Sequence, residues 1–416
     1  MKHLQQLVIG YLLVASTSIS FSMDNSHFYR ASFFNGEPRL EKPWLFTGEL
    51  AITGGNTTCA RNSSGKKVPL LDLFGKQKLQ FLGENVPGLD PQNSLDAILL
   101  ALHNNPTSQK FGRLSLSARF DIFEQILAVY QNLCSGFFLH AYVPMRKISV
   151  TGFRWRDCTP LAEQTIAWQT LLQSLDAILA RYDMCIRSFS KTAMGDLTLL
   201  AGWTLNYEDT DYLDFIDATI QTGVLFPTGK NKSLHNVLDM PSGYDGHYAL
   251  PIMLDASIGL YEWLTLGIHG DSLIFFNRTA IRHLKTSRKT NGFIQLAQAP
   301  TRIHSGALCN AAVYLKADHF LKGLSLLLGY TYSNKKRDTL RPCIPGFNET
   351  IINSDSLLFG WRMHTLNLSA EYDFATESHP CAPRIGIVYN RVFGGRRIFT
   401  TPILGSSISV DVSWCY

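Results

Sequence analysis

A histidine and an aspartate stand two positions apart in the sequence, at His269 and Asp271. Residues with this spacing lie on one face of a β-strand, so a strand here would place an imidazole beside a carboxylate, the pairing used in general acid–base catalysis. A further histidine, His140, lies in another segment of alternating residue types. The sequence contains no G-x-S-x-G, H-E-x-x-H or Walker motif that would supply a nucleophile, a zinc ion or a bound nucleotide. We therefore interpret the pair as part of a larger polar surface, and we predict no catalytic residue, metal site or cofactor.

The larger polar surface consists of charged and amide side chains that recur at alternate positions along many segments. If they face a common interior, opposite charges create a transverse field that orients small polar solutes, and an excess of carboxylates favours cations. The alternative is that the charges pair with one another and fill a narrow interior. The residues that we predict to line this interior are Arg113, Arg119, Asp121, Asp196, Asp217, Gln221, Asp255, His269, Asp271, Asn310, Lys316, Asn367, Glu371, Asp373 and Asp411.

The segments that carry these residues are predicted to be β-strands because apolar and polar residues alternate with a period of two. Most are close to the ~9–11 residues that a tilted membrane strand needs. The pattern predicts about twelve strands: Trp44–Thr53, Arg113–Gln131, Phe137–Val143, Asp196–Asn206, Phe215–Phe226, Ala249–Leu260, Trp263–Leu273, Ile303–Ala317, Leu324–Ser333, Thr365–Phe374, Arg384–Phe393 and the C-terminal stretch Ser406–Tyr416.

The connections between these strands alternate between short and long. Asn132–Gly136 and Leu260–Trp263 are short, whereas Gly54–Gly112 and Arg146–Met194 are long. This alternation is typical of an up-and-down barrel whose two rims face different compartments. In lipid a β-structure must close on itself to pair every backbone group. We predict an all-β fold, a transmembrane antiparallel up-and-down β-barrel over residues 44–416 with polar faces inward. A soluble secreted β-protein with the faces reversed stays the alternative.

Two residues interrupt the strand pattern. Glu124 falls on the apolar face of its segment, so we expect it beyond the hydrocarbon band, where a charge costs much less. Pro251 lies within a predicted strand, and its missing N–H requires a bulge or a strand end at that position.

Two long connections carry helical patterns, near residues 92–104 and 159–183. In the second, Thr159 and Pro160 offer a cap and a first-turn proline, and apolar residues then repeat at helical spacing. Such a helix either folds into the pore mouth or caps the barrel rim. Cys158 and Cys185 flank this helix and are predicted to form a disulfide that stabilises the loop by roughly 3 kcal/mol.

The first 22 residues are predicted to be an export signal. Lys2 and His3 precede the apolar run Leu7–Ala15, and Ser20 and Ser22 provide small residues for cleavage. The run is shorter than the ~20 residues of a spanning helix. Residues 23–43 then form a periplasmic segment. The net charge of +5 includes no basic block, which excludes nucleic acid as an expected partner.

The C-terminal stretch places Ile408, Val410, Val412, Trp414 and Tyr416 on one face and ends on an aromatic residue. Together with the signal, this stretch resembles bacterial outer-membrane β-barrel proteins of the porin-like kind. The resemblance implies that Trp414 and Tyr416 are read by the barrel-assembly machinery, with tyrosine in place of the usual phenylalanine. It also implies contact with outer-membrane lipid in a Gram-negative-type bacterium. The passage Ile220–Lys230 is similar to hydrophobic-compound transporters of the phenol-degradation type.

We expect an outer-membrane channel for the passive passage of small-molecule solutes through a polar lumen, and no enzymatic activity. Two alternatives remain open. One is a structural or adhesion barrel whose outer loops carry the function, and the other is an outer-membrane hydrolase.

Overall fold

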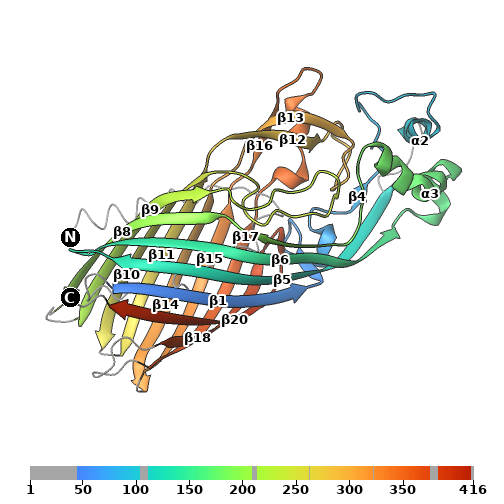
Figure 1. Ribbon diagram of the computed structural model, residues 1–416. Coiled ribbons are helices and arrows are strands. Elements are labelled where there is room, and N and C mark those ends of the chain that lie inside the picture. The colour runs from blue at the N-terminus through green and yellow to red at the C-terminus, as the bar shows by residue number, and fades with distance from the viewer. Residues whose placement is uncertain are drawn as a thin grey trace, which may run out of the picture.

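The computed structural model describes residues 45–103, 111–208, 213–261, 263–321, 323–374 and 383–413. Within these residues twelve long antiparallel strands close into a barrel, which confirms the predicted fold class (Figure 1). Among the same residues, no helix is long and apolar enough to cross a membrane. The barrel strands are β1 (Leu45–Thr57), β5 (Arg113–Asn132), β6 (Phe137–Asp157), β8 (Leu197–Glu208), β9 (Phe215–Phe226), β10 (Ala249–Tyr261), β11 (Leu264–Phe275), β14 (Leu308–Leu321), β15 (Leu324–Lys335), β17 (Arg362–Asp373), β18 (Arg384–Arg396) and β20 (Ile403–Ser413).

The barrel closes between its first and last strands. Strand β1 pairs with β20 in one antiparallel register, from Leu45 opposite Ser413 to Gly55 opposite Ile403. On its other side β1 pairs with β5, which pairs in turn with β6, and the remaining strands follow in chain order. The C-terminal strand is therefore held by a partner along its length. The predicted signal (1–22), the periplasmic segment (23–43) and the predicted assembly signal at Trp414 and Tyr416 lie outside the described residues.

The outer face of the barrel is apolar. Every second residue of each strand points outward, and large side chains there stay open to the surroundings, such as Ile268 at 55% and Leu328 at 49% exposure. A soluble protein rarely exposes a continuous apolar surface of this extent, whereas a lipid-facing barrel requires one. Exposed aromatic residues lie near both ends, as in interfacial girdles: Phe137, Trp203, Trp263, Tyr372 and Phe374 toward the short turns, and Tyr248, Phe276, Tyr330 and Phe393 toward the long loops.

Two prolines lie on barrel strands where a hydrogen-bond ladder is interrupted. Pro144 lies where β6 changes partner, from β8 up to Tyr142 to the short strand β7 (Phe189–Met194) from Met145 onward. Pro251 lies in a gap of the β9–β10 ladder, between the pairs made by Ala249 and Ile252. A proline lacks the N–H that a ladder uses, so both gaps absorb the missing donor. The register of the β9–β10 ladder is the same on both sides of Pro251, so the gap involves no bulge, and Pro251 is the third residue of β10 rather than its end.

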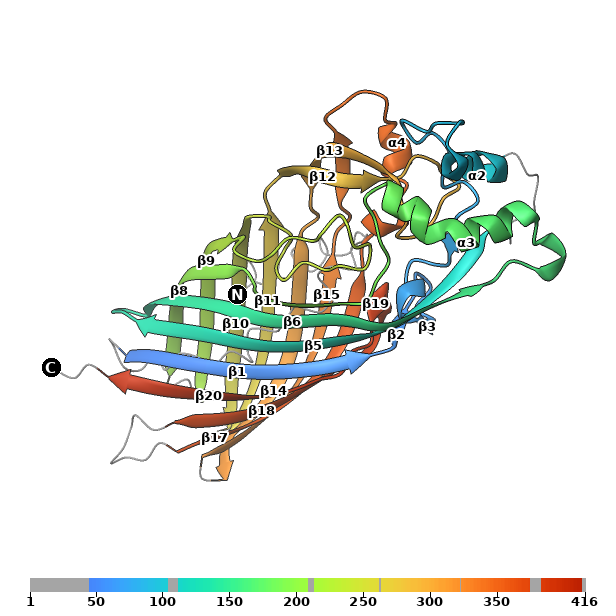
Figure 2. The same cartoon turned by 45° about the vertical axis from the view of Figure 1, so that its right-hand side comes forward.

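Strands β5 and β6 are much longer than their neighbours. Strand β6 spans 21 residues rather than the segment Phe137–Val143 that alternation predicted. The two strands continue past the ring as a twisted ribbon, which supports the segments above the barrel (Figure 2). A further short strand, β4 (Gln77–Lys78), pairs with the upper part of this ribbon.

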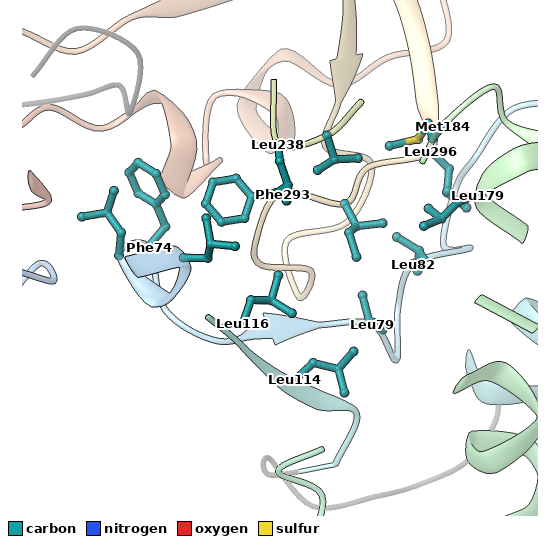
Figure 3. Close-up of a cluster of buried hydrophobic side chains, with 14 of the residues drawn as sticks. Phe74, Leu79, Leu82, Leu114, Leu116, Leu179, Met184, Leu238, Phe293 and Leu296 are labelled. Carbon is teal, nitrogen blue, oxygen red and sulfur yellow. The ribbon is translucent and has the colours of Figure 1, made fainter. Parts of the chain in front are cut away.

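The long connections fold together into a lid over one end of the barrel (Figures 1 and 2). The lid has its own apolar core, in which Phe74, Leu114, Leu179, Leu238 and Phe293 come from five distant parts of the chain (Figure 3). Burying this surface is the main free-energy gain for loops of this length. The lid elements are β2 (Cys59–Arg61), β3 (Lys67–Pro69), η2 (Leu70–Asp72), α2 (Ser94–His103), η3 (Leu161–Glu163), α3 (Ile166–Arg181), β12 (Arg278–Leu284), β13 (Ala297–His304), β16 (Thr339–Pro342), α4 (Glu349–Ile352), η4 (Ser356–Leu358) and β19 (Ile398–Phe399).

Both predicted helical insertions lie in the lid, above the ring of strands (Figure 1). Helix α3 begins at Ile166, later than the sequence indicated, because Thr165 is its N-cap and accepts a hydrogen bond from the Trp168 N–H. Thr159, the predicted cap, instead accepts a hydrogen bond from the Gly112 N–H. Helix α3 lies beside α2 at the far end of the ribbon, where Trp168 Nε1 donates a hydrogen bond to Asp157 at the end of β6 (Figure 2).

Helices α2 and α3 are joined by a buried carboxylate. Asp96 of α2 has no exposed surface and accepts hydrogen bonds from Arg181, the Tyr182 hydroxyl and the Asp90 N–H. Burial raises the pKa of Asp96, but the hydrogen bonds from Arg181 and its other donors outweigh burial, so the net pKa lies below its ordinary value. Burial, together with the Asp96 hydrogen bond, raises the pKa of Tyr182 to about 12. The carboxylate therefore stays ionised and holds the two helices together at neutral pH.

The predicted Cys158–Cys185 disulfide is wrong, because both residues are free thiols. Each backbone is anchored to a different neighbour. The Cys158 N–H donates to the Arg113 carbonyl, whereas Cys185 exchanges hydrogen bonds with the segment 235–237. Helix α3 lies between them and carries the chain about 24 Å.

Candidate functional site

The inner wall of the barrel carries most of the predicted polar residues. Alternation places the second face of each strand inward, and these side chains are more buried than their outward neighbours. Twelve of the residues predicted to line the interior occupy this face or its rim: Asp196, Asp217, Gln221, Asp255, His269, Asp271, Asn310, Lys316, Asn367, Glu371, Asp373 and Asp411.

Three predicted lining residues lie elsewhere, because the two faces of β5 are reversed relative to the prediction. Arg119 and Asp121 point outward and pair with each other, Nε to Oδ1, at 2.8 Å. Arg113 shares their phase, at the far end of the ribbon. The inward face of β5 is largely apolar because residues such as Phe120 and Ile122 pack into the lid core. The mainly apolar face of β5 therefore points inward, whereas the other barrel strands mostly turn their polar faces inward.

The same reversal explains Glu124, which was expected on the lipid side. Glu124 is 5% exposed, and its Oε1 accepts a hydrogen bond from the Arg146 Nε at 2.7 Å. The two residues lie directly opposite each other on β5 and β6. The prediction missed this buried ion pair. A lone acid on an apolar face was the available signal, and Arg146 lay in a segment predicted to be a loop.

A second charged cluster surrounds His269 on the inner wall. Its Nδ1 lies 3.3 Å from Asp255 Oδ2, and its Nε2 lies 3.1 Å from Asp271 Oδ1. The Tyr314 hydroxyl donates to Asp255 at 3.1 Å, and the Asn310 amide donates to Asp271 at 2.9 Å. The imidazole is thus held between two carboxylates. Because both ring nitrogens are engaged and His269 is only 4% exposed, the His269–Asp271 pair connects neighbouring strands of the wall.

The histidine of the third segment, His140, is also part of the wall. Its ring stacks on Tyr130 with centroids 4.0 Å apart, and its Nδ1 lies 3.4 Å from Gln221 Oε1. The structure does not bring His140 together with His269 in a shared site. Within the described residues, no group of three or more His, Cys, Asp or Glu side chains is arranged to hold a metal ion.

Part of the inner wall presents polar atoms that the described chain leaves unsatisfied. Asn310 Oδ1, Ser333 Oγ, Thr365 Oγ1 and Asn390 Oδ1 are buried and have no hydrogen-bond partner among the described residues. They come from four consecutive strands, β14, β15, β17 and β18. Buried polar groups are almost always satisfied by protein or water, so this wall is suited to contact with water or a hydrogen-bonding solute.

The connection between β9 and β10, residues 227–248, lies across the loop end of the barrel, as Figure 2 shows in yellow-green. We call it the mouth segment. Arg146, held by Glu124, donates from Nη1 to the Ser242 carbonyl at 2.5 Å. On the ribbon side, Lys191 donates to the Asp239 carboxylate at 2.6 Å. Charged side chains of β6 and β7 therefore hold the segment in place.

A carboxylate at the start of β8 fixes the same segment from a second side. Asp196 accepts hydrogen bonds from the backbone N–H groups of Gly229 at 2.9 Å and Tyr244 at 2.5 Å. The segment runs so close to Asp196 that a Cβ on Gly243 would lie 2.3 Å from its carboxylate atoms. Only glycine fits here without displacing the contact. Asp196 was predicted as a lining residue, and the structure places it at the mouth.

A cluster of buried apolar side chains lies where the mouth segment meets the wall. Tyr244 packs against Phe275 with ring centroids 5.2 Å apart, and Leu273, Leu308 and Met363 belong to the same buried cluster. The mouth segment thus bridges from β6, through Arg146, to strands on the other side of the ring. The mouth segment therefore packs against apolar side chains of the inner wall.

Carboxylates outnumber cationic side chains on the inner face. Among the described residues, the cationic side chains of this face include Arg146, Lys316, Lys335 and Arg384, and the carboxylates include Glu49, Glu124, Glu208, Asp217, Asp255, Asp271, Asp318, Glu371, Asp373 and Asp411. Ion pairs join Arg384 to Asp411, Lys316 to Asp318 and Lys335 to Asp338. Pairing lowers the field of each charge but leaves a net negative interior.

The chain was compared with protein-family models, curated proteins and solved structures. No protein-family model and no curated protein matches the chain. Among solved structures, the chain is similar to an outer membrane channel from Pseudomonas putida F1, with 12% identity, a TM-score of 0.47 and coverage of 89% of this chain and 96% of that one. A mutant of the TodX monoaromatic hydrocarbon channel gives 12% identity, a TM-score of 0.35 and 96% coverage of each chain. The translocator domain of the autotransporter NalP from Neisseria meningitidis gives 9% identity, a TM-score of 0.35 and coverage of 90% of this chain and 89% of that one. Because all three TM-scores lie below 0.5, we base no conclusion on these likenesses.

Proposed function

We propose that this chain is an outer-membrane channel that passes small polar solutes passively through the barrel, past a constriction formed by the mouth segment. The observation that carries the proposal is the contrast between the two faces of the same strands. The outer face is apolar and the inner face is polar. A barrel with this arrangement has a water-compatible interior in lipid.

The chemistry of the inner wall favours hydrophilic solutes. Unsatisfied atoms such as Asn310 Oδ1 and Thr365 Oγ1 offer acceptors and donors along one wall. The carboxylate excess attracts cations and repels anions at short range. The proposed solutes are therefore small, hydrated and neutral or positively charged. The proposal assigns no catalytic step to the chain.

The mouth segment gives the channel a restricted entrance. Arg146 and Asp196 hold this segment through direct hydrogen bonds, and both are buried. Small solutes are expected to pass, whereas large ones are stopped at the constriction. Removing the hydrogen bonds of Arg146 or Asp196 to the mouth segment should raise the flux of solute through the barrel without changing the inner wall.

A second candidate function rests on the lid. The lid buries a continuous core, and such a rigid outer platform suits the display of a binding surface. In that case the interior is filled and the barrel serves as an anchor. The two functions differ in flux, which is expected only for the channel.

The location of the channel is part of the proposal. The predicted signal at residues 1–22 would export the chain, and Trp414 with Tyr416 would be recognised by the barrel-assembly machinery of a Gram-negative-type bacterium. The apolar belt of the barrel would then contact outer-membrane lipid.

Liposome swelling tests the proposal directly. Proteoliposomes that contain the full chain are transferred to iso-osmotic solutions of neutral solutes of graded size. Swelling with the smallest solutes and a sharp decline with size are expected. Absence of swelling with every solute, in a preparation whose heat-modifiable gel migration proves a folded barrel, contradicts the channel and leaves the lid as the functional part.

A further inference from the structure

We propose that the outer surface of β15, β17 and β18, near the lid, binds the phosphate groups of a membrane lipid. The basic patch consists of Arg362, Arg391 and Arg396, and we call it the rim patch. It lies on the lipid-facing side of the barrel. The proposal therefore does not depend on passage of solutes through the interior.

The strand registers bring the three arginines together. Arg362 of β17 lies directly opposite Arg396 of β18, and Arg391 lies opposite Leu366 on the same two strands. The neighbouring residues Met363 and Thr365 are buried on the inner face, so alternation turns Arg362 outward. Arg391 and Arg396 are exposed.

The rim patch has no anionic partner within the described part of the chain. No ion pair joins Arg362, Arg391 or Arg396 to a carboxylate among these residues, whereas Arg146 and Arg384 of the inner wall each have one. Like charges directly opposite each other across two strands are destabilising. A bound anion removes this repulsion, and the planar guanidinium groups match the oxygens of a phosphate.

An aromatic cluster adjoins the arginines and is suited to an interface. The Tyr330 hydroxyl lies 2.7 Å from His364 Nδ1, and the His364 ring lies 5.2 Å from the Tyr332 ring. Phe393 lies 6.1 Å from both Tyr330 and His364, centroid to centroid, and is 50% exposed. Such amphipathic rings occupy the level of lipid headgroups in membrane proteins.

The position of the rim patch selects a lipid over a soluble anion. Directly below it on the same strands, Leu366, Leu368 and Ile387 are exposed and belong to the apolar belt. A lipid can therefore place its acyl chains on the belt and its phosphate on the arginines at the same time. A free phosphate can contact only the arginines.

The test compares two triple variants of the full chain in detergent. Arg362→Gln/Arg391→Gln/Arg396→Gln removes the rim patch. Arg288→Gln/Arg302→Gln/Arg341→Gln removes equal charge from exposed lid positions, including the pair Arg302 and Arg341, which are also directly opposite each other. Deep-rough lipopolysaccharide, the same lipid after dephosphorylation, and inorganic phosphate serve as probes, and native mass spectrometry measures binding.

The wild-type chain and the lid variant are expected to retain the phosphorylated lipid, and the rim variant to bind it on the order of 100-fold more weakly. The dephosphorylated lipid should bind weakly to all three. Equal lipid binding by the rim variant and the wild type overturns the proposal. Displacement of the lipid by inorganic phosphate at equal phosphate concentration overturns the lipid assignment and indicates a free-anion site. Heat-modifiable migration of each variant shows that the barrel is folded, and swelling assays on the same samples report separately on the channel.

Discussion

Release of the mouth segment from the wall should open the channel, and the contacts of Arg146 set the size of the effect. The variant Glu124→Gln/Arg146→Met removes the buried ion pair and the hydrogen bond from Arg146 to the Ser242 carbonyl. Both residues are changed because removal of Arg146 alone would leave a buried carboxylate without its partner, which costs about 3–5 kcal/mol.

The magnitude follows from one charge-assisted hydrogen bond between the wall and the mouth segment. Such a bond contributes about 2 kcal/mol. Its loss therefore shifts the equilibrium between the held and released segment by roughly 30-fold. Single-channel recording in a planar bilayer measures this shift as a rise in open probability, or as a larger conductance if release is complete.

A matched control removes a different buried ion pair of the inner wall. Arg384 and Asp411 lie at the short-turn end of the barrel, 3.3 Å apart from Nη2 to Oδ1. The variant Arg384→Met/Asp411→Asn should leave gating unchanged, although it weakens the seam between β18 and β20. The reasoning is refuted if both double variants, or neither, change the open probability while both barrels remain folded.

Three further predictions concern single residues. Gly243→Ala should push the mouth segment away from Asp196 and raise the rate at which protease cleaves residues 227–248, with little change in the melting temperature of the barrel. Hydrogen bonds from Arg181 hold the pKa of Asp96 below its unfolded value near 3.8, so Asp96 stabilises the lid above that pH, and this stabilisation is lost as the pH falls through the lower folded pKa. Trp168 fluorescence measured against pH should show the loss, and Asp96→Asn should abolish this pH dependence. Asp271→Asn should reduce cation preference, measured as a reversal potential closer to zero in a salt gradient.

The sequence was sufficient to predict the barrel because one physical constraint acts on every strand. Lipid outside and polar side chains inside impose a period of two, and short turns alternate with long loops. A closed barrel leaves no strand edge unpaired, so its first and last strands must pair, as β1 and β20 do. The predicted segments at Leu324–Ser333 and Phe215–Phe226 agree with β15 and β9 to within two residues at each end.

The phase of β5 could not be predicted by the same rule. Its inward face meets the lid core, where Phe120 and Ile122 are buried by loops from elsewhere in the chain. Alternation shows that a strand has two faces, but it does not show which face meets protein. The extension of β6 was missed because Pro144 and the charged pair Arg146 and Lys147 interrupt the apolar pattern where the strand changes partner.

The constriction at the mouth depends on contacts between residues far apart in the sequence. Arg146 reaches Ser242 and Asp196 reaches Tyr244, across separations of 96 and 48 residues. Neither the segment 227–248 nor these partners carry a local motif that indicates such contacts. Loop packing of this kind is fixed by the three-dimensional arrangement, and the sequence alone indicated only that the loop is long.

The most direct test of the central claim is the conductance of the wild-type chain in a planar bilayer under a salt gradient. A polar, net-negative interior predicts discrete conductance steps and a reversal potential of the sign that cation preference gives. Absence of conductance, both in the wild type and in Glu124→Gln/Arg146→Met with proven folded barrels, would contradict the channel.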